Sequence, residues 1–314
     1  MSDFYNDVWR GLNASPKYLQ SKYFYDAKGD AIFREIMNCP EYYLTNCELE
    51  IFSQHNDDLA NTLLSHLHDF DVVELGAGDA TKSIYLLEAL LKQNVDFTYY
   101  PIDISENIIA LLNKKLPEKL SGINVKGLNG EYFDMLDKLK EMSNRNKVVL
   151  FLGSNVGNIL LDNTVDFFTA LRSHMSPGDL VLTGFDLKKD PAVVLAAYND
   201  KAGITKRFNL NLLQRINDTF DADFDLLQFE HRPVYNEQTG ACKSYLVSKK
   251  DQRVRIGEAG WIYLKEGEQI FMEISQKYTV RQTDEFAQAA GFVPVGHFYD
   301  ERKWFLDALW QVAS

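Results

Sequence analysis

Cysteine is scarce in this sequence, and its three cysteines form no recognisable motif. They stand at Cys39, Cys47 and Cys242, with no CxxC pair. An odd and dispersed set excludes a disulfide framework and a cysteine zinc site. The six histidines likewise lack HExxH or a comparable ligand spacing. We therefore expect no metal site, and a reducing compartment, the cytoplasm.

Long apolar runs and an excess of positive charge are also absent. No stretch approaches the roughly 18 apolar residues of a membrane span, and the first residues lack the basic and apolar regions of a signal peptide. Lysine and arginine number 33 against 45 aspartates and glutamates, so the formal net charge of −12 repels phosphate backbones and anionic lipids. These absences predict a soluble protein with no nucleic-acid or membrane partner, and we expect a monomer.

The remaining composition is that of a globular α/β protein. Hydrophobic residues make up 46% and charged residues 25%, and 314 residues are enough for two domains. Five β-branched runs alternate with helical patterns, as in a parallel sheet built from βαβ units. They lie at 71–78, 96–105, 123–130, 147–155 and 178–186. We predict a doubly wound Rossmann-like sheet domain from 63–186 plus 281–314, and a second α+β cap domain from 1–62 plus 187–280.

A glycine-rich turn closes the first predicted strand. Glu74, Gly76 and Gly78 form an ExGxG pattern at the carboxyl edge of the sheet, where open α/β folds bind ligands. A dinucleotide-binding loop requires GxGxxG, but Thr81 occupies the last position. The pattern instead resembles the S-adenosyl-L-methionine (SAM) loop of class I methyltransferases. A dinucleotide oxidoreductase is the weaker alternative, and an ordinary βα turn is the purely structural one.

Polar residues after the next strands fit the same cofactor. Asp103 can accept two hydrogen bonds from vicinal ribose hydroxyls, although with Ser105 it can also cap the following helix. Glu131 and Tyr132 offer an acceptor for an adenine amino group and an aromatic wall. Lys82 can form an ion pair with the methionyl carboxylate of SAM. Considered without the other residues, it would be interpreted as a flexible surface lysine.

Longer blocks resemble a known family over nearly the whole chain. They are FYDAKGDAIFREIMNCPEYYLTNCELEIF (24–52), VVELGAGDATKS (72–83), FLGSNVGN (151–158), DLKKDPAVVLAAYNDKAGITKRFNLNLLQRIN (186–217) and FMEISQKY (271–278). Together they resemble the histidine Nα-methyltransferases of ergothioneine biosynthesis. The resemblance implies a class I SAM-dependent fold, a small-molecule substrate, L-histidine, and methylation of its α-amino group to the trimethylated betaine, hercynine.

The resemblance also assigns roles to individual residues. SAM contacts are implied for Gly76, Lys82, Asp103, Glu131 and Tyr132. Substrate contacts are implied for Tyr42, Asn158 and Tyr198 at the α-amino and α-carboxylate groups, for Glu273 and Ser275 at the imidazole, and for Gly153 and Thr205 as supporting contacts. The residues implied to act on the reacting amine are Tyr25, Phe33, Tyr42 and Asn158. Without the resemblance, the aromatic residues among these would read as core.

One departure from the family keeps other readings open. Polar Ser244 aligns where the family's members carry a methionine against the substrate side chain. An N-methyltransferase of another amino acid or amine, such as tryptophan or tyrosine, is therefore an alternative. A non-catalytic SAM-binding protein is a further one, although Tyr42, Asn158 and Tyr198 are all present.

Overall fold

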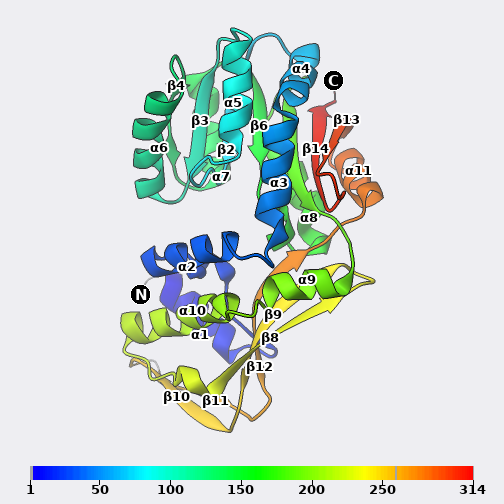
Figure 1. The fold of residues 1–314 in the computed structure, drawn as a ribbon. Helices are drawn as coiled ribbons and strands as arrows, with labels where there is room; N and C mark the ends of the chain where they lie inside the picture. The colour runs from blue at the N-terminus through cyan, green and yellow to red at the C-terminus, as the bar shows by residue number, and fades with distance from the viewer. Residues whose placement is uncertain (1–2, 259, 314) are drawn as a thin grey trace. The chain divides into compact units, whose positions relative to one another are not determined.

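The computed structural model describes residues 3–258 and 260–313, which divide into two compact units (Figure 1). Unit 1 comprises residues 1–43 and 189–275, and unit 2 comprises residues 44–188 and 276–314. Residues 44–62, which we predicted in the cap domain, belong to unit 2. The reason is tertiary packing, since the helix over Asn56–His66 lies against the first helix that follows the glycine loop.

Unit 2 is built on an eight-stranded sheet with the order β13-β14-β7-β6-β2-β3-β4. The eighth strand, β5, pairs with the carboxyl-terminal end of β3. Its strands are β2 (Phe70–Leu75), β3 (Thr98–Asp103), β4 (Asn124–Val125), β5 (Leu128–Asn129), β6 (Asn146–Phe151), β7 (Leu180–Asp186), β13 (Phe292–Tyr299) and β14 (Phe305–Val312). The strands from β7 to β4 run parallel, and β14 is antiparallel to both of its neighbours. This is the class I Rossmann-like architecture that we predicted.

The helices of unit 2 cover both faces of this sheet (Figure 1). They are α3 (Tyr43–Gln54), α4 (Asn56–His66), α5 (Ser83–Lys92), α6 (Glu106–Lys119), α7 (Tyr132–Met142), α8 (Thr164–Ser173) and α11 (Val280–Ala289), with 3-10 turns η2 (Asn155–Asn158) and η3 (Leu161–Asn163). Helices α7, α8 and α11 share one buried cluster with the strands, and α5 covers the other face. Because both faces are covered, β2 is buried along its whole length.

Strand order places a ligand-binding edge at β2. The chain runs from β2 outward to β3 and β4, and then returns to β6 on the other side of β2. In open α/β sheets, the carboxyl ends of the strands at such a switch point form the usual binding crevice. The predicted third strand is reduced to β4 and β5, which are separated at Gly127.

Unit 1 combines a second sheet with helices. Its four-stranded sheet has the order β1-β12-β9-β8, and β10 and β11 form a separate hairpin. The strands are β1 (Lys17–Tyr18), β8 (Phe229–Asn236), β9 (Ala241–Ser248), β10 (Gln252–Ile256), β11 (Gly260–Leu264) and β12 (Gln269–Gln276). The helices are α1 (Asp3–Asn13), α2 (Ala27–Met37), α9 (Pro191–Tyr198) and α10 (Ile204–Phe220), with η1 (Ser21–Phe24) and η4 (Leu226–Gln228). An apolar cluster from both layers forms its core.

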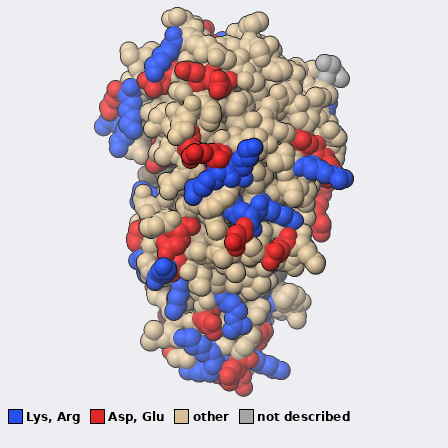
Figure 2. Space-filling model, turned by 45° about the vertical axis from the view of Figure 1, so that its right-hand side comes forward, with Lys and Arg blue, Asp and Glu red and all other residues tan. Residues whose placement is uncertain are grey.

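No helix of the described residues is both long and apolar enough to cross a bilayer. On the face shown in Figure 2, acidic and basic side chains are interspersed. Although the net charge is negative, this face therefore carries side chains of both signs.

Trp310 on β14 lies in the buried core of unit 2. Its ring is fully buried and lies 4.7 Å from Phe168, 5.6 Å from Phe185 and 5.9 Å from Phe292, measured between ring centroids. Trp310→Ala should lower the free energy of unfolding by about 3–5 kcal/mol, because it leaves a large cavity. Urea denaturation followed by circular dichroism measures this. Leu227→Ala, at a side chain that is 79% exposed, should change it by less than about 0.5 kcal/mol, and equal effects would contradict the assignment.

Candidate cofactor and substrate residues

The glycine loop after β2 has the geometry of a ligand cradle. Gly76 and Gly78 both adopt left-handed backbone angles, with φ of +71° and +53°. A Cβ on Gly76 would lie 2.7 Å from the Tyr132 hydroxyl, so a side chain there is excluded, whereas a Cβ on Gly78 would meet no atom within 4 Å. The loop therefore combines a close approach to Tyr132 with open space beside Gly78.

Asp103 performs a local structural role and keeps capacity for a ligand. Its carboxylate accepts hydrogen bonds from the backbone N–H of Gly78 at 3.3 Å and of Ser105 at 2.9 Å. The hydroxyl of Ser105 in turn accepts from the N–H of Ile108, which confirms Ser105 as the N-cap of α6. A carboxylate has about four acceptor positions, so two vicinal hydroxyls fit beside these bonds.

Tyr132 and Glu131 begin α7 at the same edge. The Tyr132 ring packs edge-on against Phe151 with centroids 6.0 Å apart, and burial raises the pKa of its hydroxyl to about 12. It is therefore a neutral hydroxyl at pH 7. Glu131 is the exposed residue just before the helix. The loop after β2, the end of β3 and the start of α7 thus bring together the groups that an adenosyl ligand needs.

Lys82 is held by a carboxylate rather than being a mobile surface side chain. Its ammonium forms an ion pair with Glu48 of α3, whose side chain is only 1% exposed. Both carboxylate oxygens of Glu48 also accept from the backbone N–H of Gly153, at 2.7 and 2.9 Å. Burial alone lowers the pKa of Lys82, but Glu48 and other nearby carboxylates outweigh it, so the pKa lies above its usual value. Lys82 remains charged and is fixed beside the loop after β6.

A second buried carboxyl group, Asp307 on β14, lies beside Glu48. A Cβ on Gly184 of β7 would stand 2.3 Å from an oxygen of Glu48 and 3.2 Å from one of Asp307, so glycine at this position makes room for both. Burial and the charge of Glu48 raise the pKa of Asp307 well above its usual range. Lys82 is paired with Glu48, so we expect Asp307 to be protonated in the folded protein.

Glu74 of the ExGxG pattern is also buried. Tyr99 of β3 donates a hydrogen bond to its carboxylate. Burial, offset in part by hydrogen bonding and by Lys82, raises the pKa of Glu74 to about 7. The charge of Glu74 near pH 7 therefore depends on its burial and on its hydrogen bonds.

The loop after β6 carries two further predicted residues. Gly153 and Ser154 both adopt left-handed angles, with φ of +74° and +54°, as expected for this glycine- and asparagine-rich loop. Asn158, at the end of η2, is exposed. Gly153 is thus a partner of Glu48 as well as a candidate for ligand contact.

In unit 1, two tyrosines and a serine come together. The Tyr198 hydroxyl at the end of α9 forms a 2.6 Å hydrogen bond with the hydroxyl of Ser275 on β12. The Tyr42 ring packs edge-on against Tyr198, with centroids 6.2 Å apart. Tyr42, Tyr198 and Ser275, distant in the sequence, are therefore neighbours in unit 1.

Glu273 lies two residues earlier on β12 and contacts α10. One of its carboxylate oxygens accepts a 3.0 Å hydrogen bond from the side-chain amide of Asn209. The same amide donates to the backbone carbonyl of Thr205 at 3.1 Å. Thr205 is buried in the first turn of α10, where its N–H donates to Asp200 at 2.8 Å. Glu273 is therefore a positioned carboxylate rather than the freely solvated residue of an alternating strand.

The remaining predicted residues of unit 1 form an aromatic group. Tyr25 and Phe33 are 5.7 Å apart between centroids and meet edge to face, and Phe208 of α10 lies 5.8 Å from each. Tyr25 is 42% exposed, so the group reaches the surface. Ser244, the departure from the family pattern, is buried on β9.

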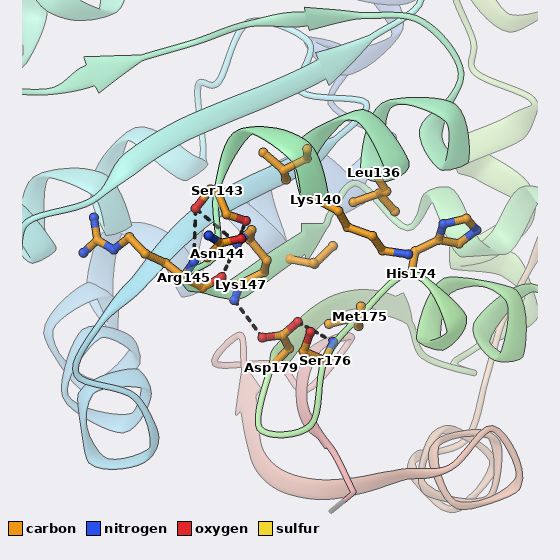
Figure 3. A pocket seen from close by; sticks show the side chains of 12 residues that line it. Leu136, Lys140, Ser143, Asn144, Arg145, Lys147, His174, Met175, Ser176 and Asp179 are labelled. Carbon is orange, nitrogen blue, oxygen red and sulfur yellow. Dashed lines mark hydrogen bonds between the residues drawn. The ribbon is translucent and has the colours of Figure 1, made fainter.

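A cavity of about 240 Å³ lies at the opposite, amino-terminal edge of the unit 2 sheet (Figure 3). Its cationic lining is already paired. Lys140 and His174 both contact Asp137, at 3.1 and 2.7 Å, and Arg145, which points away from them, pairs with Asp71. We therefore assign the cofactor to the carboxyl edge. Among the described residues, no group of three or more His, Cys, Asp or Glu side chains is arranged to hold a metal ion.

Residues 4–312 match the family model described as histidine-specific, SAM-dependent methyltransferases. The chain belongs to this family. A histidine N-alpha-methyltransferase of Mycobacterium tuberculosis is 32% identical, over 94% of this chain and 90% of its own. Ergothioneine biosynthesis protein 1 of Schizosaccharomyces pombe is 31% identical over 89% of this chain, which spans only 37% of that longer protein. An L-tryptophan methyltransferase of Psilocybe serbica is 26% identical, over 94% of this chain and 89% of its own.

Membership makes this chain a SAM-dependent methyltransferase, and the described residues fit that cofactor. The open space beside Gly78, the remaining acceptor positions of Asp103 and the positive charge of Lys82 are chemically compatible with SAM. Each lies at the carboxyl edge of the sheet, where the fold binds ligands.

Sequence reasoning missed three buried polar residues of this methyltransferase, namely Glu48, Asp307 and Asn209. Two of them had a signal. Glu48 occupies the core-facing stripe of α3 with Leu44, Cys47 and Ile51, and Asp307 interrupts the apolar run of β14. A charged residue at an apolar position requires a buried partner. The partners were not identifiable, because they lie far away along the chain.

Replacing Asp307 by asparagine tests its protonation. Because the pKa of Asp307 is raised on folding, its contribution to stability is complete below the unfolded-state pKa of about 4 and is lost as pH rises through the folded-state pKa. Asparagine has a similar shape and cannot ionise. The stability of D307N relative to wild type should therefore increase with pH, by roughly 1.4 kcal/mol for each pH unit between the two pKa values.

Urea denaturation of both proteins between pH 4 and pH 9 measures this difference. Glu74 titrates in both proteins and cancels in the comparison. A stability difference that is constant with pH would show that Asp307 is ionised in the folded methyltransferase.

Proposed function

We propose that this methyltransferase transfers methyl groups from SAM to the α-amino group of L-histidine, three times in succession, to give hercynine. The observation that carries the substrate assignment is on β12. There, the carboxylate of Glu273 is held by Asn209. Ser275, two residues further along the strand, is hydrogen-bonded to Tyr198. A positioned carboxylate and a hydroxyl suit the two nitrogens of an imidazole, and the relative from Mycobacterium tuberculosis is named for histidine.

We assign SAM to unit 2, with Gly76 and Tyr132 at the cradle, Asp103 at the ribose, Lys82 at the methionyl carboxylate and Glu131 at the adenine. When bound, SAM supplies an electrophilic methyl group on a sulfonium. The chain then has to orient the acceptor amine and exclude water, which is a proximity effect. Gly153 and Asn158 stay predictions based on the family resemblance.

We assign the amino acid to residues of unit 1. Tyr42 and Tyr198 offer hydroxyls to its α-amino and α-carboxylate groups, with Thr205 as a supporting residue and with Glu273 and Ser275 at the side chain. Methylation converts the amine into a bulkier cation with fewer N–H donors. The faces of Tyr25 and Phe33 accept such a cation, and one cation–π contact contributes about 0.5–2 kcal/mol.

Tryptophan is the second candidate substrate. The Psilocybe serbica relative is named an L-tryptophan methyltransferase, and Ser244 departs from the methionine of the family pattern. An indole has one N–H and no second ring nitrogen, so it would use Glu273 or Ser275 but not both. Comparing the substrates directly distinguishes the two proposals.

Incubation with SAM and each of the twenty amino acids, followed by mass spectrometry, tests the proposed reaction. We expect a histidine product heavier by three methyl groups. Methylation of tryptophan or another amino acid alone would overturn the histidine assignment while keeping the SAM site. No product in any incubation, with SAM binding intact, would favour the non-catalytic alternative.

Glu273→Ala tests the imidazole assignment. Losing a charged hydrogen bond to the substrate should lower kcat/KM for histidine by about 10- to 100-fold, since such a bond contributes roughly 1.5–3 kcal/mol. Activity toward an amino acid with an apolar ring, such as phenylalanine, should be retained or rise. Steady-state kinetics with both substrates measure the ratio, and unchanged histidine kinetics would remove Glu273 from the site.

A further inference from the structure

Asn209 is a buried amide whose orientation is fixed by its neighbours. Its side chain on α10 is 0% exposed. Its nitrogen donates to a carboxylate oxygen of Glu273 at 3.0 Å and to the backbone carbonyl of Thr205 at 3.1 Å. Both neighbours are acceptors, so exchanging the amide nitrogen and oxygen would place acceptor against acceptor. Both amide hydrogens are therefore used, one of them on Glu273.

The other end of the same amide makes asparagine a costly residue at this position. The side-chain oxygen of Asn209 is buried and has no hydrogen-bond partner among the described residues. Leaving a buried acceptor unpaired costs stability, so natural proteins rarely keep one without a use. An apolar residue would fill this position of α10 at lower cost. The cost is explained if the asparagine is kept for its nitrogen, which orients Glu273.

We propose that Asn209 is a specificity-determining positioning residue, which holds the Glu273 carboxylate in the orientation that recognises an N–H group on the ring of the substrate. This inference rests on the proposed function, because it takes Glu273 as the residue that meets the imidazole. Without the Asn209 donor, Glu273 would keep its charge but lose a fixed direction. Selectivity for a ring with an N–H donor over an apolar ring would then fall.

Two substitutions separate the donor from the space that it fills. Asn209→Leu removes the donor at similar volume, and Asn209→Asp keeps the shape but places a second carboxylate against Glu273. The matched control is Asn211→Leu. Asn211 is another buried asparagine on α10, but its amide donates to Asp26 at 3.2 Å instead of to Glu273.

Binding is measured by titrating histidine into each protein in the presence of S-adenosylhomocysteine, and kinetics are measured with histidine and phenylalanine. We expect Asn209→Leu to weaken histidine binding and raise its KM by about tenfold, as for the loss of roughly 1.4 kcal/mol. The kcat should change less than threefold, and selectivity for histidine over phenylalanine should fall. Asn209→Asp should weaken histidine binding more than Asn209→Leu does. Asn211→Leu should leave histidine affinity and the selectivity for histidine over phenylalanine unchanged.

Affinity for S-adenosylhomocysteine, expected within twofold of wild type, checks that each variant is folded. If the leucine variant fails this check, the aspartate variant decides. Wild-type histidine affinity in a folded Asn209 variant, or an equal loss in Asn211→Leu, would overturn the inference. If the wild-type protein itself neither binds nor methylates histidine, the proposed function fails instead, so the two failures are distinguishable.

Discussion

The buried ion pair between Lys277 and Asp186 fixes the point at which the two sequence segments of unit 2 are joined. The pair is 2.6 Å long and neither side chain is exposed. Two backbone hydrogen bonds support it, from Tyr278 N–H to the Asp186 carbonyl and from Lys188 N–H to the Tyr278 carbonyl. A charge removed from water is tolerated only beside its partner. The pair therefore requires the segment leaving unit 2 near residue 188 and the segment returning near residue 276 to lie side by side, and the sheet depends on that junction.

The same requirement explains the polar residues around the cofactor edge and on β12. Glu48 occupies a core position, so it must be paired, and its partners Lys82 and Gly153 belong to the two loops that follow β2 and β6. Glu273 is paired with Asn209 in the same way. The buried Glu48 thus orients Lys82, and the half-buried Glu273 is itself oriented by Asn209. Polar groups at apolar positions thus cost stability and supply orientation.

What the sequence could predict depended on whether the relevant partners were local. The tight turn at Gly76 and the Ser105 cap are each defined by a few neighbouring residues, and the structure has both. The roles of Gly76 and Asp103 at the cofactor stay predictions. The contacts of Asn209 with Glu273 and of Gly153 with Glu48 join residues 64 and 105 positions apart, and no local pattern encodes them. The predicted boundary at residue 62 was wrong for a similar reason, because the packing of α4 on α5 is tertiary.

The insertion of β14 between β7 and β13 has a consequence for synthesis of the chain. Every residue of β7 pairs with β14 along one side, from Leu180 with Gln311 to Asp186 with Phe305. While the ribosome is still adding residues before Phe305, β7 remains an edge strand rich in leucine and valine, and such edges readily pair with other chains. The parallel half of the sheet is translated long before its edge is covered. Protection of the nascent chain during this interval is thus a requirement built into the strand order.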